Sequence, residues 1–260
     1  VSPEVFALEM KHLWRNTWIY VGHDSQVPNV GDYVSTTLAT QPVILVRSED
    51  QKVRVLMNRC AHKGAKLVNA LKGHCEANLL RCPYHGWTFR LDGSIRSIPQ
   101  KGGYEGTAFG ESAASQGVVE LLNVVNYRVF VFARLAPNGP SFEAYFGDSL
   151  TSIDNMVDRS PEGRLEVTGG VLRYMHDCNW KMFIENLNDT MHPMVAHESA
   201  AGTAKKLWAG KPEDVPKPMA IEQFLPFVNG YGFFDEMGVK LWDNGHSYSG
   251  VKFSIHSKYS

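Results

Sequence analysis

The sequence has few cysteines, no excess of charge of one sign and no long apolar run, and each absence excludes a class of protein. Four cysteines in 260 residues are too few for a disulfide scaffold. Lys and Arg total 26 against 27 Asp and Glu, so the overall charge gives no reason to expect a nucleic-acid or membrane partner. No apolar stretch approaches the roughly 20 residues that span a bilayer, and the first residues are too polar for a signal peptide. We therefore expect a soluble, cytoplasmic globular protein.

The two ends of the sequence suggest a piece of a longer protein. The first residue is Val1 rather than Met, and the last, Ser260, lies inside an alternating pattern. This pattern, over residues 251–260, predicts an unfinished strand. We expect the chain to be a fragment.

Hydrophobic periodicity predicts a β-rich first part. Loose helical spacing after Ser2 and Pro3 predicts a short helix over residues 3–18. Beyond it, short β-branched and aromatic runs alternate with Gly, Pro and polar residues, which is typical of strands joined by turns. The predicted strands cover residues 17–22, 32–38, 42–47, 52–58, 78–81, 87–90, 94–97, 118–125 and 127–133.

A mixed second part follows a boundary predicted at residues 137–140. The pattern predicts a helical stretch over 141–157, a strand over 166–176 and a helix from about Asn179, followed by a Gly- and Pro-rich region. The predicted fold class is therefore α+β, with a β-rich domain over 18–136 and an α+β domain, an antiparallel sheet with helices, over 137–260.

Two short motifs in the β-rich part combine thiol and imidazole side chains. Cys60 and His62 form Cys-x-His, and Cys82 and His85 form Cys-x-x-His, each between predicted strands. Two thiolates and two imidazoles suit either a tetrahedral zinc site or a Rieske [2Fe–2S] cluster, in which one iron takes two Cys and the other two His. A zinc knuckle usually brings two sulfurs from one turn, whereas here each loop brings one sulfur and one nitrogen. The spacing favours the cluster.

These motifs resemble the Rieske domain of aromatic-ring-hydroxylating oxygenases, at Cys60-Ala-His62-Lys-Gly64 and at Cys82-Pro-Tyr84-His85-Gly86-Trp87. Rieske proteins of respiratory chains carry an extra cysteine in each loop, which this chain lacks. The resemblance implies a reduction potential toward the low end of the Rieske range, on the order of −150 mV, and hence a strong electron donor.

The remaining cysteines are not needed for the cluster. We expect Cys75, with its neighbour His74, to be a loop or edge residue, because the set of two Cys and two His is complete without it. We expect Cys178 to be a small buried hydrophobe.

A second group of polar residues lies on the helix predicted from Asn179. Asp189 and His192 are three residues apart, so the carboxylate can accept a hydrogen bond from the imidazole and fix its tautomer. His192 and His197 are five apart, about 140° around an ideal helix, and cannot easily bind one metal from an unbroken helix. Pro193 predicts the break, since it disfavours the α conformation at His192 and can begin a new turn. Two histidines plus a carboxylate are typical of non-haem Fe(II) sites.

The pattern Glu-x3-Asp-x2-His-x4-His, carried by Glu185, Asp189, His192 and His197, resembles the mononuclear-iron motif of the same oxygenase family. The resemblance implies that the two histidines bind iron and that Asp189 links this iron to a cluster histidine of a neighbouring subunit, His85 more than His62. Asn186 and Leu187 would lie near the iron and face the substrate, and Glu185 would have a structural role. We expect the helix over 1–17 to belong to the catalytic domain.

The family's third iron ligand is an acid far beyond the two histidines. None of the available acids lies in a matching context, and we expect the ligand beyond Ser260. The candidates without such a context are Asp214, Glu222, Asp235, Glu236 and Asp243.

The resemblance implies an α subunit in an α3 or α3β3 assembly. Such an enzyme uses O2 and electrons from NAD(P)H, relayed by a reductase or ferredoxin, to hydroxylate a small aromatic compound. The product is most often a cis-dihydrodiol. The alternatives are a Rieske monooxygenase or demethylase of a substituted aromatic acid or quaternary amine, and a Rieske electron carrier. Some apolar residues of the second motif could line the substrate pocket or simply belong to the core, namely Leu187, Met191, Met194 and Val195.

Positive charge is concentrated around the first two motifs. Residues 51–101 hold ten Lys or Arg against two acids. This excess suits docking of an acidic ferredoxin near the cluster, although a merely solvated basic face gives the same count.

Overall fold

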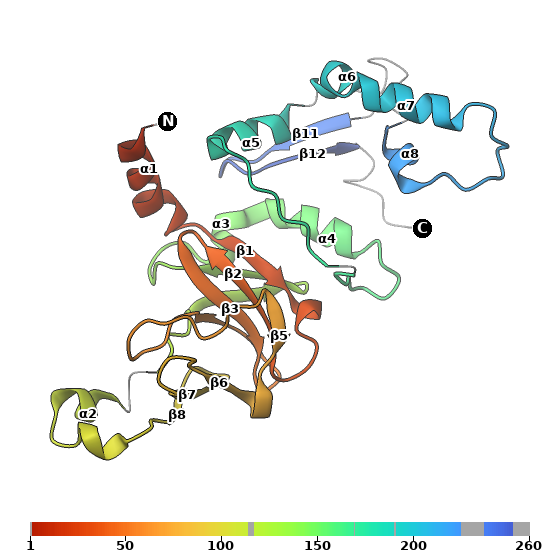
Figure 1. The fold of residues 1–260 in the computed structure, drawn as a ribbon. Helices are drawn as coiled ribbons and strands as arrows, with labels where there is room; N and C mark the ends of the chain where they lie inside the picture. The colour runs from red at the N-terminus through yellow and green to blue at the C-terminus, as the bar shows by residue number, and fades with distance from the viewer. Residues whose placement is uncertain (1, 114–116, 169, 190, 225–236, 252–260) are drawn as a thin grey trace. The chain divides into compact units, whose positions relative to one another are not determined.

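The computed structural model describes residues 2–113, 117–168, 170–189, 191–224 and 237–251. The chain divides into two compact units, residues 1–145 with 164–172 (unit 1) and residues 146–163 with 173–260 (unit 2). Unit 1 holds most of the described strands, and unit 2 holds the two longest described helices (Figure 1). None of the described helices is both long and apolar enough to cross a membrane.

Unit 1 begins with the predicted short helix. The side chain of Ser2 accepts a hydrogen bond from the backbone N–H of Val5 and so caps α1 (Pro3–Glu9). A π-helical segment, Met10–Trp14, continues the helix to the first strand.

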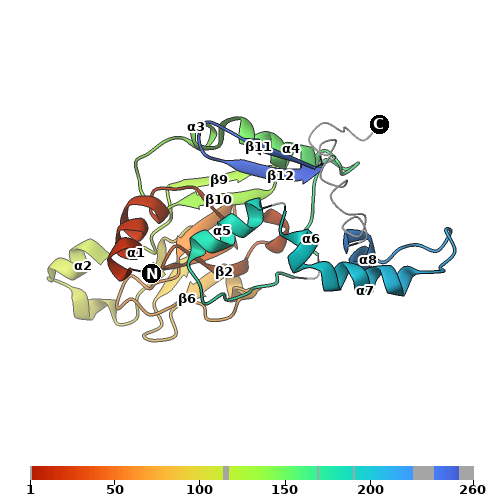
Figure 2. The same ribbon diagram turned by 90° about the horizontal axis from the view of Figure 1, so that it is seen from above.

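Antiparallel strands build three sheets in unit 1 (Figures 1 and 2). The sheets have the orders β4-β3-β2-β5, β1-β10-β9 and β6-β7-β8. The strands are β1 (Ile19–His23), β2 (Asp32–Leu38), β3 (Gln41–Arg47), β4 (Val53–Met57), β5 (Lys72–His74), β6 (Leu79–Arg81), β7 (Thr88–Arg90), β8 (Ile95–Ser97), β9 (Asn123–Tyr127) and β10 (Phe130–Arg134). Short 3-10 and helical segments join them: η2 (Asp24–Gln26), η3 (Glu76–Asn78), η4 (Lys101–Tyr104) and α2 (Ala108–Ala113).

Most strand predictions for unit 1 are confirmed to within about two residues. The exceptions are β5, which was not predicted, and the runs over 118–125 and 127–133. In the first run, Glu120 makes only an isolated bridge to Leu56, and β9 begins at Asn123. The second run begins too early, because Arg128 and Val129 adopt positive φ and form the turn before β10.

Strand β3 is buried on both faces and separates two hydrophobic cores. Ile44 and Val46 belong to one buried cluster, which also contains the cysteines of the ligand loops, and Val43 and Leu45 belong to the other. Alternate side chains of a strand point to opposite faces, so the continuous apolar run in this segment fills both cores. The buried core that contains Ile44 and Val46 lies directly behind the predicted ligands of the [2Fe–2S] cluster.

Unit 2 carries helices and one hairpin. Its elements are the last residue of α3 (Phe142–Phe146), η5 (Gly147–Leu150), α4 (Thr151–Val157), α5 (Trp180–Asn188), α6 (Pro193–Ala196), α7 (Glu198–Trp208), α8 (Met219–Phe224), β11 (Met237–Leu241) and β12 (Ser247–Val251). The helical stretch predicted over 141–157 is confirmed, and Asn179 caps α5 through a hydrogen bond from the backbone N–H of Lys181. The strand predicted over 251–260 lies outside the described residues except for Val251.

The strand predicted over 166–176 is wrong. Its described residues form no strand, and the backbone N–H of Val167 donates to Ser25 Oγ instead of to a neighbouring strand. Leu172 and Met175 are exposed. A β-branched run becomes a strand only when a partner satisfies its backbone groups, and the described part of the chain supplies none here.

Candidate functional site

Two loops of unit 1 share one backbone pattern and carry the four predicted cluster ligands. The N–H of Cys60 and that of Cys82 each donate to the carbonyl five residues later, at 2.8 Å. The N–H of Gly64 donates back to the Cys60 carbonyl, and that of Gly86 to the Cys82 carbonyl, both at 3.0 Å. Both glycines have φ of +72°, a conformation that a side chain disfavours. Each loop therefore turns tightly around its cysteine.

A buried asparagine braces the first loop from its base. Asn58 Oδ1 accepts hydrogen bonds from the backbone N–H groups of Leu67 and Val68, at 2.9 and 3.1 Å. Its Nδ2 donates to the carbonyl of Val68 at 2.8 Å. A buried side chain with these groups satisfied holds the two ends of the loop together.

The two cysteines form the sulfur end of the site. Cys60 and Cys82 are both buried. Burial raises the pKa of the Cys60 thiol and the neighbouring Cys82 thiol raises it further, whereas the backbone of His62 and Lys63 lowers it. Two adjacent buried thiols become stable thiolates only with a compensating positive charge, which a metal ion supplies.

The two histidines form a separate nitrogen end. The ring centroids of His62 and His85 lie 4.7 Å apart at an interplanar angle of 64°. His62 Nδ1 is buried and has no hydrogen-bond partner. Leaving such an atom unpaired costs about 1–3 kcal/mol, so the nitrogen fits a position that a metal occupies.

The pairing of like ligands favours a two-iron cluster over zinc. A tetrahedral zinc ion takes four ligands around a single point, whereas a Rieske cluster takes two sulfurs on one iron and two nitrogens on the other. The donors present therefore fit the [2Fe–2S] group.

The other two cysteines lie outside this arrangement. Cys75 is buried in the same core, and burial raises its pKa to about 11, which is typical of an inert thiol. His74 Nδ1 pairs with Asp32 Oδ1 at 2.9 Å. Cys178 is exposed, so its prediction as a buried hydrophobe is wrong; it lies in an exposed stretch just before the Asn179 cap.

The second histidine pair lies at the break between α5 and α6. Asp189 ends α5, Pro193 is the first residue of α6, and the rings of His192 and His197 come to 5.4 Å between centroids. The predicted break is confirmed. His192 nevertheless has α-region angles, φ −60° and ψ −29°, contrary to the expected effect of Pro193. As the cap residue before a helix of only four residues, it does not continue α5, and the break falls nearer Asp189.

Hydrogen bonds set the tautomer of His192 differently from the prediction. The ring Nδ1 lies 2.8 Å from the backbone carbonyl of Asp189 and 3.6 Å from its carboxylate. The carboxylate instead accepts from the backbone N–H groups of Met191 and His192, and these bonds hold the pKa of Asp189 below its usual value. The His192 Nδ1–H therefore donates to a carbonyl, and Nε2 keeps its lone pair.

The amide of Asn186 occupies the free side of that ring, with its Nδ2 3.1 Å from His192 Nε2. Asn186 therefore marks the position at which a metal on Nε2 would lie. No described acid joins the two histidines as a third ligand, and Asp235 and Glu236 lie outside the described residues.

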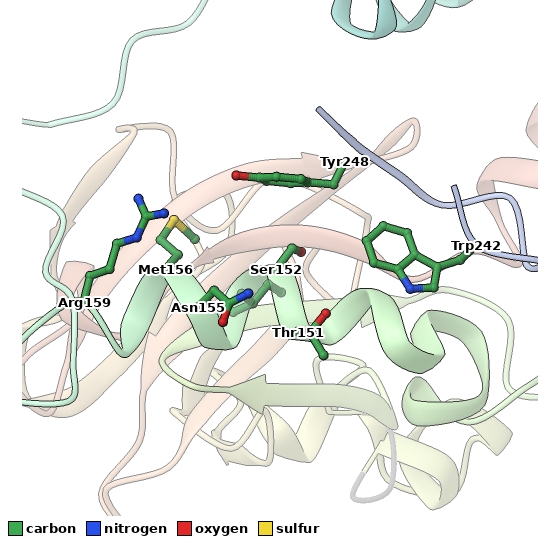
Figure 3. Close-up of a pocket in the computed structure, with 8 residues that line it drawn as sticks. Thr151, Ser152, Asn155, Met156, Arg159, Trp242 and Tyr248 are labelled. Carbon is green, nitrogen blue, oxygen red and sulfur yellow. The ribbon is translucent and has the colours of Figure 1, made fainter. Parts of the chain in front are cut away.

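The residues predicted to line a substrate pocket do not enclose one in the described structure. Leu187, Met191 and Val195 are exposed. A cavity of about 210 Å³ instead lies in unit 2 between α4 and the β11–β12 hairpin (Figure 3). Trp242 and Tyr248 face Thr151, Ser152, Asn155 and Met156 of α4 across it, with Arg159 just beyond the end of that helix (Figure 3).

Sequence reasoning missed the aromatic surroundings of His62. Trp87, Tyr104 and Phe109 all lie within 6.4 Å of its ring, centroid to centroid. Trp87 follows Gly86 within the second motif, which was a signal of proximity, but nothing in the local pattern marks the other two.

The chain is similar in sequence to proteins of known function. Residues 17–117 match the family model of the Rieske [2Fe-2S] domain. The chain is 34% identical over 207 residues to the toluate 1,2-dioxygenase subunit alpha of Pseudomonas putida, covering 79% of this chain and 44% of that protein. The chain spans about half the length of the curated relatives it matches.

Solved structures with the same fold include two kinds of enzyme. Naphthalene 1,2-dioxygenase from Rhodococcus sp., bound to indole, superposes with a TM-score of 0.70 at 32% identity, covering 77% of this chain and 45% of that one. A quaternary ammonium Rieske monooxygenase with L-carnitine gives 0.65 at 25% identity, covering 78% and 55%. The predicted fold class is confirmed.

Proposed function

The chain belongs to the α subunits of Rieske aromatic-ring-hydroxylating oxygenases, and on that premise we propose that it takes part in O2-dependent hydroxylation, as a dioxygenase, of a small aromatic compound. The observation that carries the proposal is the presence of two separate histidine pairs in one chain. His62 and His85 accompany two buried cysteines, and His192 and His197 meet downstream without any cysteine. An electron carrier needs only the first pair.

Each group of ligands suits one metal centre. Cys60 and Cys82 would bind one iron of the [2Fe–2S] cluster, and His62 and His85 the other. His192, through Nε2, and His197 would bind a mononuclear Fe(II). When bound, the cluster supplies single electrons and the mononuclear iron activates O2.

The chain's own residues prepare the second centre. The carbonyl of Asp189 holds the proton on Nδ1 of His192, so Nε2 faces the iron position as a lone pair. Asn186 Nδ2 donates to that lone pair, so this residue lies beside the position that iron would take. A third, carboxylate ligand belongs to this proposal but is not assigned to a residue.

Electrons would enter and leave through the exposed side of the cluster. His85 is exposed and its ring lies 3.8 Å from that of Tyr84, whereas His62 is half-buried. This supports His85 as the histidine that meets Asp189 of a neighbouring subunit in an α3 or α3β3 assembly. The same proposal places residues 1–17 with the catalytic domain.

The basic surface around the ligand loops supports an acidic ferredoxin, or a reductase, as donor. Arg54 is paired with Asp50 and Glu120 and adds little to this surface. Lys63, Arg81 and Lys101 are exposed in or near the ligand loops. Electrons would come from NAD(P)H, and we place this electron-transfer system in the cytoplasm.

The substrate proposal is an aromatic compound of the kind named for the relatives, which act on toluate, biphenyl, benzene and naphthalene. A monooxygenase acting on a substituted aromatic acid or a quaternary amine is the second candidate, supported by the structural match to the carnitine-binding enzyme. Product analysis separates them, because a cis-dihydrodiol keeps both oxygen atoms of O2 on the ring.

Metal content tests the proposal directly. Purified holoprotein should contain about three irons per chain, with the visible and EPR spectra of a [2Fe–2S] centre with two Cys and two His ligands. About two irons per chain would support a carrier instead. A zinc-only, colourless protein would contradict the proposal.

A further inference from the structure

One histidine of the first pair lies flat against a buried indole. The rings of His62 and Trp87 are 4.9 Å apart between centroids and only 3° from parallel. Trp87 is 1% exposed, and it belongs to the core cluster behind the ligand loops. Parallel rings at this separation must be offset, which is the favourable stacking geometry, worth about 0.5–1.5 kcal/mol beyond burial.

Two further aromatic rings lie near both His62 and Trp87. Tyr104, at the end of η4, and Phe109, in α2, lie 6.4 and 6.1 Å from His62, and 6.2 and 5.8 Å from Trp87. Their own centroids are 5.1 Å apart. We call Trp87, Tyr104 and Phe109 the aromatic wall. Figure 1 shows α2 at the same end of unit 1 as β6, β7 and β8.

A glycine allows the outer layer of the wall to close. A Cβ at Gly110 would lie 1.9 Å from the carbonyl oxygen of Tyr104 and 2.8 Å from its carbon. Those are backbone atoms, so α2 and η4 would have to separate before a side chain fitted. A Cβ at Gly103, in η4, would have no other atom within 4 Å.

The other histidine has no such cover. His85 is exposed, and its nearest ring is that of Tyr84, which is 66% exposed. The two nitrogen ligands of one iron are therefore held in unlike ways, one against a buried indole and two half-buried rings and one at the surface.

We propose that Trp87 is a positioning residue for the cluster: with Tyr104 and Phe109 it fixes the ring plane of His62 and keeps water from that side of the iron. The inference rests on the proposed function, because it requires that a [2Fe–2S] cluster is bound. The aromatic wall then sets the reduction potential as well as the geometry. With two Cys and two His ligands the oxidised cluster carries no net charge and the reduced cluster one negative charge, so exclusion of water disfavours reduction.

Trp87→Leu removes the ring and opens this side. We expect the reduction potential, measured by protein-film voltammetry on the holoprotein, to rise above the parent value. We also expect the two histidine nitrogen couplings in pulsed EPR to change, with the one from His62 broadened because its ring is no longer held. Trp87→Phe keeps a ring and should recover most of both properties.

Phe89→Leu is the matched control. Phe89 is fully buried in the same core, its ring centroid lies 6.4 Å from that of Trp87, and its ring does not contact that of His62. Its loss should lower thermal stability but leave potential and nitrogen couplings as in the parent. An unchanged potential in Trp87→Leu, or an equal shift in Phe89→Leu, overturns the proposal.

Gly110→Ala opens the wall without touching Trp87, and Gly103→Ala is its control. We expect the first to raise the potential and the second to leave it unchanged. If Trp87→Leu does not retain its cluster, the Gly110→Ala result decides, and an unshifted potential in that variant rejects the inference. A parent holoprotein with no [2Fe–2S] spectrum would instead reject the proposed function, which keeps the two failures distinct.

Discussion

The two histidine pairs have similar ring separations but very different support. His62 and His85 lie 4.7 Å apart on loops whose backbone bonds and buried cysteines hold them from below. His192 and His197 lie 5.4 Å apart where one helix ends and a four-residue helix begins. The first arrangement is built by the described residues of unit 1 alone. The second depends on a few local bonds around Asp189.

The apolar residues near the two histidine pairs differ in burial. A buried core that includes both ligand cysteines lies behind the first pair. Around the second, Met182, Leu187 and Val195 are exposed in the described structure. We infer that the first site tolerates changes elsewhere in the chain, whereas the second is sensitive to any change that shifts α5 or α6.

The largest expected effect breaks the first site. Cys82→Ala should remove the cluster, because each iron needs two protein ligands, and iron content should fall by about two per chain. Cys75→Ala is the control, since Cys75 lies buried in the same core but outside the ligand pairs. Visible absorption and iron analysis give the result. Loss of the cluster in both variants would mean that the core, and not the ligand set, determines binding.

The next largest effect concerns Asp189. Loss of an acid that only supports a ligand costs about 10 to 100-fold in metal affinity or activity. We expect Asp189→Asn to lose more turnover than that while both metal centres stay occupied, because the amide keeps an oxygen for the N–H groups of Met191 and His192 but carries no charge.

Asp189→Ala separates charge from local structure. This variant also removes the acceptor oxygen, so we expect iron at the second site to fall as well. Rapid-mixing reduction followed by O2 should show a reduced cluster that reoxidises slowly in Asp189→Asn. Near-parent reoxidation and product formation in that variant would make Asp189 structural only.

A smaller effect is expected at the protein surface. Lys63→Gln should slow electron transfer from an acidic donor by roughly two- to five-fold at low salt and weaken its dependence on ionic strength. Lys205→Gln makes the same charge change in α7 and should have no effect. Stopped-flow reduction at several salt concentrations distinguishes the two. A parent rate that is insensitive to salt would show that the basic face is merely solvated.

The smallest effect is a pH dependence of folding stability in unit 1. His23 is 1% exposed with Nε2 unpartnered, and its Nδ1 accepts from the Ser25 backbone N–H. Burial lowers its pKa below the ordinary value of about 6.5. The unfolded chain then binds the proton more readily, so this contribution to stability is present above about pH 6.5 and is lost as pH falls below it.

Urea unfolding of the parent and of His23→Gln at pH 7.5 and pH 5.5 tests this dependence. The parent should lose more stability on acidification than the variant does. Equal losses would show that other groups account for the acid sensitivity.

The local sequence pattern was sufficient to predict the structure where a single strand, cap or motif determined it. The run over 32–38 is β2 as predicted, and Asn179 caps α5 as predicted, by accepting a hydrogen bond from the backbone N–H of Lys181. The ligand motifs could be recognised because Cys-x-His and Cys-x-x-His fix both residue types and spacing. Strand β5, with the sequence Lys-Gly-His, carries no such signal and exists only because β2 offers it an edge.

Contacts between distant segments could not be predicted. The strand expected over 166–176 failed for lack of a partner, and helix α7 lies in a region whose Gly and Pro content hid it. The stacking of Trp87 on His62 depends on two loops folding against each other, and its outer layer on a close approach at Gly110. No pattern within one segment encodes these distances.

The shared backbone pattern of the two ligand loops has a consequence for how the protein matures. Cys60 and Cys82 would share one iron, and His62 and His85 the other, so neither iron has its protein ligands until both loops are in place. Cluster delivery must therefore follow, or drive, the docking of the second loop on the first. In cells short of iron, we expect newly made chains to keep this pair of loops open and to be cut there by proteases first.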